Sequence, residues 1–164
     1  MIGNDSSPFD SKVKGSISNR VNESVVLLAR ENKEFILINQ YRAPLDDYII
    51  QLPGGGVEEQ ENLEDAVRRE FQEETGYECG VVHYLGSMVP AAWYSNEVTH
   101  AYYTEEILDQ GIQRTESHEY IQIQRLTIQD CLSKIKENTI HDSELCYAVL
   151  QAHIKGYIEI GVHN

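Results

Sequence analysis

The chain has 164 residues, the usual size of one domain, and its hydrophobic share of 41% is enough to build a core. Its formal net charge of -14, from 27 acidic and 13 basic residues, repels phosphate backbones and argues against nonspecific binding of nucleic acid. No stretch approaches the roughly 20 apolar residues of a membrane span and the N-terminus lacks a signal-peptide pattern, so a cytoplasmic protein without a membrane partner is expected.

The N-terminal part of the chain predicts a loose arm followed by strands. Residues 1–22 are polar, and one domain is expected over residues 23–164. Short runs that are rich in β-branched residues predict three strands, over residues 23–30, 34–42 and 48–52. The third strand ends at Pro53-Gly54-Gly55-Gly56, which predicts a loop.

The rest of the chain predicts a central helix, three further strands and two closing helices. The central helix is expected over residues 62–75, with Asn62 as its N-cap and Gly76 just past its C-terminus. The remaining elements are strands over residues 80–89, 98–105 and 120–126 and helices over residues 127–137 and 143–155. Because strands and helices do not alternate regularly, we expect a single α/β domain without βαβ repeats.

The central helix carries glutamates on a face that should be apolar. At about 100° per residue, Glu70 and Glu74 fall within the sector of the apolar side chains, and Glu73 lies to one side of it. A solvated acidic helix is the plain alternative, but it does not explain carboxylates on a partly inward face. Crowded carboxylates repel one another unless a cation lies among them, and hard oxygen ligands suit Mg²⁺ or Mn²⁺. The helix alone therefore indicates a divalent-metal site.

The segment that contains this helix is similar to the signature of the Nudix hydrolase superfamily. That signature is a glycine, five residues, a glutamate, seven residues and then Arg-Glu-apolar-x-Glu-Glu-x-Gly-apolar. The matching positions here are Gly55, Glu61, Arg69, Glu70, Phe71, Glu73, Glu74, Gly76 and Tyr77. The resemblance implies an α/β fold, the Nudix α/β/α sandwich with a mixed β-sheet, and a metal-dependent pyrophosphohydrolase.

The resemblance also assigns roles by position. Glu70, Glu73 and Glu74 look like the ligands of Mg²⁺ or Mn²⁺, together with the backbone carbonyl of Gly55. Arg69 would orient these carboxylates through salt bridges, and it counts with Glu73 and Glu74 among the expected catalytic residues.

A general base is expected outside the helix. In proteins of this kind the base commonly lies in a loop before the last strand of the sheet, which here spans roughly residues 109–118. Glu116 is the first choice and Glu119 the second, and a solvated loop glutamate is the plain alternative for each.

Three residues outside the signature are candidates for binding substrate. Arg42 follows an apolar strand and could fork onto a phosphate, or form a strand-end salt bridge. Trp93 and Tyr94 lie in an expected loop, where they could stack on a base or a ribose, or pack within the loop. Gly55 is also expected to contact the substrate.

The flanks of the signature resemble the ADP-ribose pyrophosphatase branch of the superfamily. The resemblance lies in Gln40-Tyr41-Arg42, in Leu52-Pro53-Gly54-Gly55 and in Asn96-Glu97. Ala92 and Trp93 stand where that branch usually has proline and glycine, which leaves the substrate open.

The leading expectation is hydrolysis of ADP-ribose or a similar nucleotide sugar by a homodimer. The alternatives are hydrolysis of a nucleoside triphosphate or a dinucleoside polyphosphate and, in another functional class, nucleotide sensing without turnover. The three intact glutamates argue against a sensor.

Overall fold

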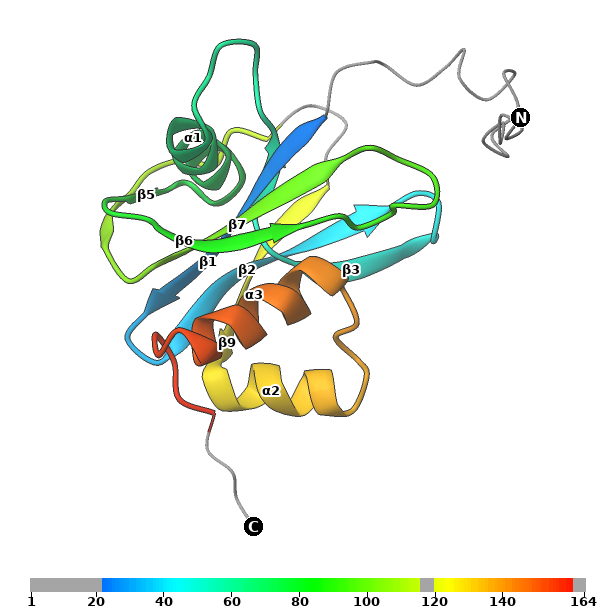
Figure 1. Ribbon diagram of the computed structural model, residues 1–164. Helices are drawn as coiled ribbons and strands as arrows, with labels where there is room; N and C mark the ends of the chain where they lie inside the picture. The colour runs from blue at the N-terminus through cyan, green and yellow to red at the C-terminus, as the bar shows by residue number, and fades with distance from the viewer. Residues whose placement is uncertain (1–21, 116–119, 161–164) are drawn as a thin grey trace, which may run out of the picture.

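The computed structural model describes residues 22–115 and 120–160 (Figure 1). Nine strands and three helices are present in these residues. The strands are β1 (Glu23–Glu31), β2 (Glu34–Arg42), β3 (Asp47–Gln51), β4 (Gly54–Gly56), β5 (Tyr77–Cys79), β6 (His83–Met88), β7 (Val98–Thr104), β8 (Ile107–Gln110) and β9 (Ile121–Thr127). The helices are α1 (Leu63–Thr75), α2 (Ile128–Lys136) and α3 (Ser143–Ile154).

A mixed sheet of seven strands forms the centre of the domain. Its main path is β3-β2-β1-β7-β6, with β4 paired to β1 and β9 paired to β2. The neighbouring strands β1 and β7 run parallel, from Glu23 opposite Val98 to Ala29 opposite Thr104. The other pairings in this sheet are antiparallel, and β5 and β8 form a separate two-stranded sheet. The expected mixed sheet is thus confirmed.

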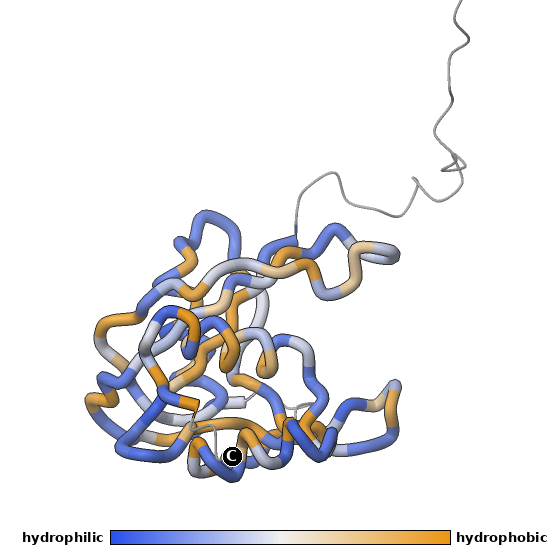
Figure 2. Tube along the Cα trace, turned by 60° about the horizontal axis from the view of Figure 1, so that its bottom comes forward, coloured by the Kyte–Doolittle hydropathy of each residue, from blue (hydrophilic) through white to orange (hydrophobic). Residues whose placement is uncertain are grey.

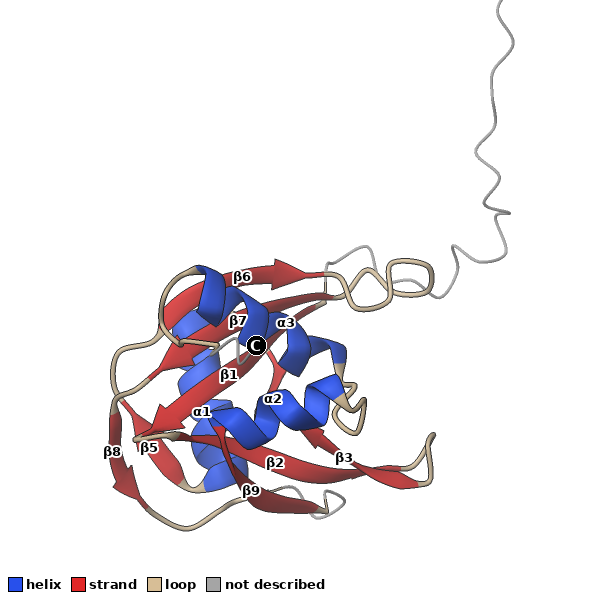
Figure 3. Ribbon diagram, turned by 90° about the horizontal axis from the view of Figure 1, so that it is seen from below, coloured by secondary structure: helices blue, strands red, loops and turns tan. Residues whose placement is uncertain are grey.

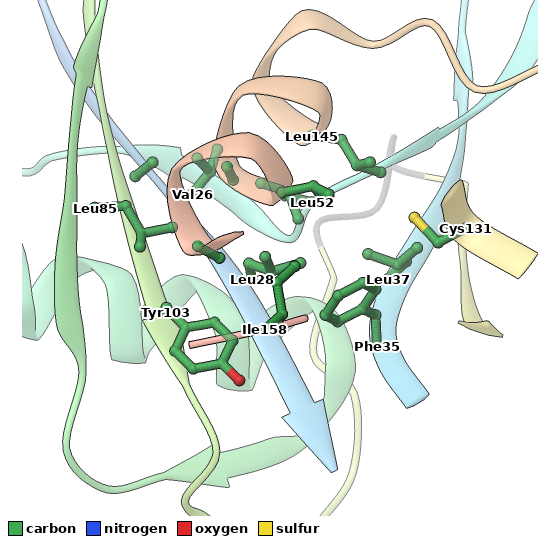
Figure 4. Packing of buried hydrophobic residues seen from close by; sticks show 14 of the residues in the cluster. Val26, Leu28, Phe35, Leu37, Leu52, Leu85, Tyr103, Cys131, Leu145 and Ile158 are labelled. Atoms are coloured by element: carbon green, nitrogen blue, oxygen red, sulfur yellow. The ribbon is translucent and has the colours of Figure 1, made fainter. Parts of the chain in front are cut away.

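Helices cover both faces of this sheet, with α1 on one side and α2 and α3 on the other (Figures 1 and 3). Strand β1 shows why, because its side chains alternate between two apolar cores. Val26 and Leu28 pack into the core beneath α2 and α3, with Leu145 of α3 (Figure 4), while Val25 and Leu27 pack into the core beneath α1. This arrangement confirms the α/β/α sandwich.

The expected elements are largely present, with three exceptions. The glycine segment after β3 was expected as a loop but contains β4, and β5 and β8 were not expected at all. Strand β4 is recognisable only through its partner, because Gly54 and Gly55 have no side chains and pair through their backbone with Val26 and Val25 of β1. Strands β5 and β8 have three and four residues, which is too short for a periodic pattern.

Hydrophilic and hydrophobic segments are mixed at the periphery of the domain. Figure 2 shows blue turns beside orange segments there, including the tip of the projection at the lower right. The turn between β2 and β3 and the loop between β6 and β7 project on the same side of the domain (Figure 3). Within the described ranges, no helix is both long enough and apolar enough to cross a membrane.

Candidate active site

Helix α1 holds its glutamates in the positions that its periodicity predicts. Asn62 caps the N-terminus, where its side chain accepts a hydrogen bond of 2.9 Å from the backbone N–H of Asp65. Gly76 ends the helix in the left-handed conformation, at φ 76°. Glu74 is only 5% exposed, whereas the side chains of Glu70 and Glu73 are 15% and 45% exposed. Two of the three carboxylates are therefore turned toward the protein, as the helical periodicity indicates.

Strand β4 lies directly against these carboxylates. The backbone N–H of Gly54 donates a hydrogen bond of 2.7 Å to Oε2 of Glu74. A Cβ atom at Gly55 would lie 2.6 Å from the carboxylate of Glu70, so only glycine allows this close approach. The structure thus brings Gly55, Glu70 and Glu74 together, as the sequence predicts.

Arg69 connects the carboxylates of the site to one another. Its guanidinium group forms a two-point ion pair with Glu61, at 2.8 and 2.9 Å. It also donates to Glu70 at 2.7 Å, to Glu73 at 3.2 Å and to the carbonyl of Gly56 at 3.1 Å. The hydrogen bond to Glu61 raises the pKa of Arg69, and the same bond lowers the pKa of Glu61. These bonds connect Arg69 to the acidic residues, and its role in orienting them stays a prediction.

A cavity of about 390 Å³ opens in front of these groups. It is lined by the three glutamates, by Arg69, by the β4 glycines and by Arg114, whose backbone N–H donates to the carbonyl of Glu73 at 2.7 Å. The sequence does not indicate a role for Arg114, since an arginine in a loop carries no local signal. Its position places a second arginine at the wall of the cavity, where its positive charge could neutralise a phosphate.

The chemistry of this cavity fits a hard divalent cation. It offers carboxylate oxygens from α1 and backbone carbonyl groups from β4, the donors that Mg²⁺ and Mn²⁺ prefer. Within the described residues, no group of three or more His, Cys, Asp or Glu side chains is gathered closely enough to hold a metal ion. Arg69 donates hydrogen bonds to two of the carboxylates, those of Glu70 and Glu73.

A larger cleft of about 830 Å³ shares the β4 wall with this cavity. Arg42 lines it, and its Nε donates to Oε1 of Gln51 at 2.6 Å. Gln51 in turn donates from Nε2 to Asp142 at 2.8 Å. The strand-end arginine therefore faces the cleft, as its proposed role requires, and it is held there by an amide side chain.

Glu144 also lines the cleft, although the sequence does not indicate a role for it. Oγ1 of Thr99 donates a hydrogen bond of 2.8 Å to Oε1 of Glu144. Burial raises the pKa of Glu144, and the charges of Asp142 and Glu97 act in the same direction. No local pattern indicates this residue. It is the second residue of α3, a helix whose sequence pattern predicts only that it packs against the core.

The remaining expected site residues lie elsewhere. Trp93 and Tyr94 are 84% and 76% exposed, their ring centroids are 5.6 Å apart, and they do not line either of these two cavities. Their role in substrate binding stays a prediction. Glu116 and Glu119, the candidates for the general base, lie outside the described residues.

This geometry can be compared with known proteins. The model of the NUDIX domain family matches residues 19–146, which is most of the chain. The chain belongs to the Nudix family. Membership in this family accounts for the meeting of the α1 carboxylates, the β4 glycines and Arg69 at one site.

The chain is also similar to individual proteins over most of its length. It is 32% identical over 127 residues to the methanol dehydrogenase activator of Bacillus methanolicus, covering 77% of this chain and 68% of that protein. It is 26% identical over 132 residues to the ADP-ribose pyrophosphatase of Bacillus subtilis, covering 79% and 71%. A crystal structure of an ADP compounds hydrolase superposes with a TM-score of 0.75 at 16% identity, covering 87% of this chain and 78% of that one.

The contact between Gly55 and Glu70 gives a first prediction. Gly55→Ala should lower kcat/KM at limiting Mg²⁺ by at least about tenfold, because the added methyl group would displace the Glu70 carboxylate. Gly56→Ala is the matched control, since a Cβ at Gly56 meets nothing within 4 Å. Equal kinetics for the two variants, measured across a Mg²⁺ titration, would contradict the assignment of Glu70.

Proposed function

We propose that this Nudix protein hydrolyses the pyrophosphate bond of a nucleoside diphosphate linked to another moiety, with ADP-ribose or a similar nucleotide sugar as its substrate. The observation that carries the proposal is the meeting of Glu70, Glu74 and Arg69 with strand β4, at a cavity that continues into a cleft of about 830 Å³. The similarity to the ADP-ribose pyrophosphatase of Bacillus subtilis supports the choice of substrate.

The proposed reaction needs negative charge to be neutralised at the pyrophosphate. Glu70, Glu73 and Glu74, with the carbonyl of Gly55, would hold Mg²⁺ or Mn²⁺. Such an ion withdraws charge from phosphate oxygens and lowers the pKa of a bound water. Arg69 holds the carboxylates of Glu70 and Glu73 through its hydrogen bonds to them.

The other groups of the site position the substrate and move the proton. Arg42 and Arg114 flank the place where the pyrophosphate would lie, one in each cavity. Water attacks one phosphorus atom, the bridging P–O bond breaks, and the products are a nucleoside monophosphate and a sugar phosphate. Glu116 remains our candidate for the base that takes the proton of the water.

The proposal is tested by the products formed from a panel of nucleotides with Mg²⁺ or Mn²⁺. The panel holds ADP-ribose, GDP-mannose, Ap4A, NADH and the common triphosphates. AMP released from ADP-ribose as the fastest reaction would support the proposal. A triphosphate or Ap4A as the best substrate would favour the alternative hydrolase, and failure to turn over any compound would favour a sensor.

Arg42 gives a second prediction. Arg42→Ala should raise KM for the best substrate by about tenfold, because one charge-assisted hydrogen bond to phosphate is lost. The control is Lys136→Ala, which removes an exposed positive charge at the end of α2. Steady-state kinetics that are equal for both variants would remove Arg42 from the binding site.

The expected homodimer is a separate proposal. It rests on resemblance alone, and sedimentation of the full chain as a monomer at assay concentrations would contradict it.

A further inference from the structure

The far end of the large cleft is lined by hydrogen-bonding side chains. We call this end the Glu144 subsite and define it by Arg42, Gln51, Glu97 and Glu144. Among the described residues that line the cleft, none is aromatic. A nucleobase is usually held by stacking on an aromatic or apolar wall, whereas carboxylate and amide groups match the hydroxyl groups of a sugar.

The carboxyl group of Glu144 is held in one orientation from behind. Thr99 is fully buried in β7, and its Oγ1 lies 2.8 Å from Oε1 of Glu144. The same hydroxyl group lies 2.9 Å from Oγ of Ser24, which is the residue opposite Thr99 in the neighbouring strand β1. Two adjacent strands of the central sheet therefore fix Glu144, so little side-chain entropy is lost when it binds a ligand.

The charged groups around Glu144 come from three parts of the chain. Asp142 precedes it at the start of α3, Glu97 lies in the loop before β7, and Arg42 ends β2. Burial raises the pKa of Glu144, and the two carboxylates act in the same direction, whereas the hydrogen bond from Thr99 and the charge of Arg42 lower it. A carboxyl group in such a setting accepts hydrogen bonds from hydroxyl groups in either protonation state, and it repels the anionic substrate less when it is protonated.

The opposite side of the subsite is equally fixed. Gln51 accepts from Arg42 at 2.6 Å and donates to Asp142 at 2.8 Å, so its amide joins the end of β2 to the start of α3. Arg42 is thereby kept beside the carboxyl group of Glu144, with its remaining guanidinium N–H groups available for phosphate or hydroxyl oxygens.

We propose that Glu144 is a specificity-determining residue, which accepts hydrogen bonds from hydroxyl groups of the sugar attached to the nucleoside diphosphate. Thr99 is its positioning residue. The assignment rests on the proposed function, since it names the group that recognises the sugar in the same cleft. It places the sugar beside Glu144 and the pyrophosphate between Arg42 and strand β4.

The test compares two substrates that differ only in the sugar. ADP-ribose carries the hydroxyl groups, whereas the methyl ester of ADP has the same nucleoside and pyrophosphate without them. Glu144→Ala should raise KM for ADP-ribose by about tenfold or more and change KM for the methyl ester by less than about twofold. The kcat for both substrates should stay within about threefold of the wild type, because Glu144 does not touch the reacting atoms in this assignment.

Three further variants make the result interpretable. Thr99→Val should raise KM for ADP-ribose in the same direction but less, because Glu144 remains and loses only its support. Glu144→Gln keeps the shape of the side chain. It replaces Glu144→Ala in the comparison of the two substrates if the alanine variant does not fold. With its amide oxygen on the Thr99 hydroxyl group, its NH₂ group would offer the cleft a donor in place of an acceptor. Glu137→Gln, at the exposed end of α2, is the control for removal of one negative charge.

Each contrary result has its own meaning. An equal rise of KM for both substrates would overturn the proposal, because Glu144 would then act on the shared nucleotide or on the shape of the cleft. A loss of kcat on both would overturn it in favour of a catalytic role, and unchanged kinetics would overturn it outright. If the wild type turns over neither compound, the proposed function fails and this assignment fails with it; turnover without discrimination by Glu144 overturns the assignment alone.

Discussion

Glu74→Gln is expected to lower kcat by at least about a hundredfold while the protein stays folded. Glutamine has nearly the same size, and its oxygen can still accept the 2.7 Å hydrogen bond from the N–H of Gly54. What it lacks is the negative charge, which a buried ligand of Mg²⁺ must supply. The measurement is turnover of the best substrate across a Mg²⁺ titration, with thermal unfolding recorded on the same sample.

The matched control for this variant lies on the same helix. Glu64→Gln removes an exposed carboxylate that pairs with Arg68, four residues along α1, and such a pair contributes at most about 0.5 kcal/mol. It should leave the rate unchanged. Near-normal turnover by Glu74→Gln would show that Glu74 is not a metal ligand, and unfolding of that variant alone would show that its charge is needed for the fold instead.

The carboxylates of α1 could be predicted from the sequence because their placement is local. The capping asparagine and the terminal glycine mark the ends of a helix of 13 residues. Because an α-helix has 3.6 residues per turn, the separation of three residues between Phe71 and Glu74 in the sequence predicts which way the Glu74 side chain points. The same holds for β1 and β2, whose apolar runs specify strands without further information.

The other half of the site depends on contacts between distant segments. Gly54 becomes part of a strand only because it pairs with Val26 of β1, 28 positions earlier in the chain. Thr99 and Glu144 meet across 45 positions, and the peptide N–H of Arg114 reaches the carbonyl of Glu73 across 41. No periodicity within one segment can indicate such contacts, since they are set by how the layers of the sandwich pack.

Trp93 and Tyr94 stand out in the sequence, but the structure does not bring them to the site. Trp93 and Tyr94 were selected because large aromatic side chains in a loop usually have a partner, and in the structure the partner of each is the other ring. The sequence shows that two aromatic side chains are available for stacking. It does not show whether the loop between β6 and β7 directs them toward the cavities or toward solvent.

Arg69→Lys is expected to weaken the apparent affinity for Mg²⁺ by about 10–100-fold, although the positive charge is kept. The guanidinium group makes a two-point bond to Glu61 and single bonds to Glu70, Glu73 and the carbonyl of Gly56. A lysine ammonium group is a compact charge with three hydrogen atoms, so it cannot reproduce this planar set. Without it, the carboxylates on α1 lose their fixed orientation.

Because the ligands themselves remain in this variant, saturating Mg²⁺ should restore most of kcat, which distinguishes positioning from a direct catalytic role. Arg68→Lys is the control, since the neighbouring arginine bonds to Glu64 and to the carbonyl of Gly80 on the side of α1 away from the cavity. A Mg²⁺ dependence in Arg69→Lys equal to that of Arg68→Lys would contradict the positioning role. A loss of kcat that saturating Mg²⁺ does not restore would instead place the guanidinium group on the reacting phosphate.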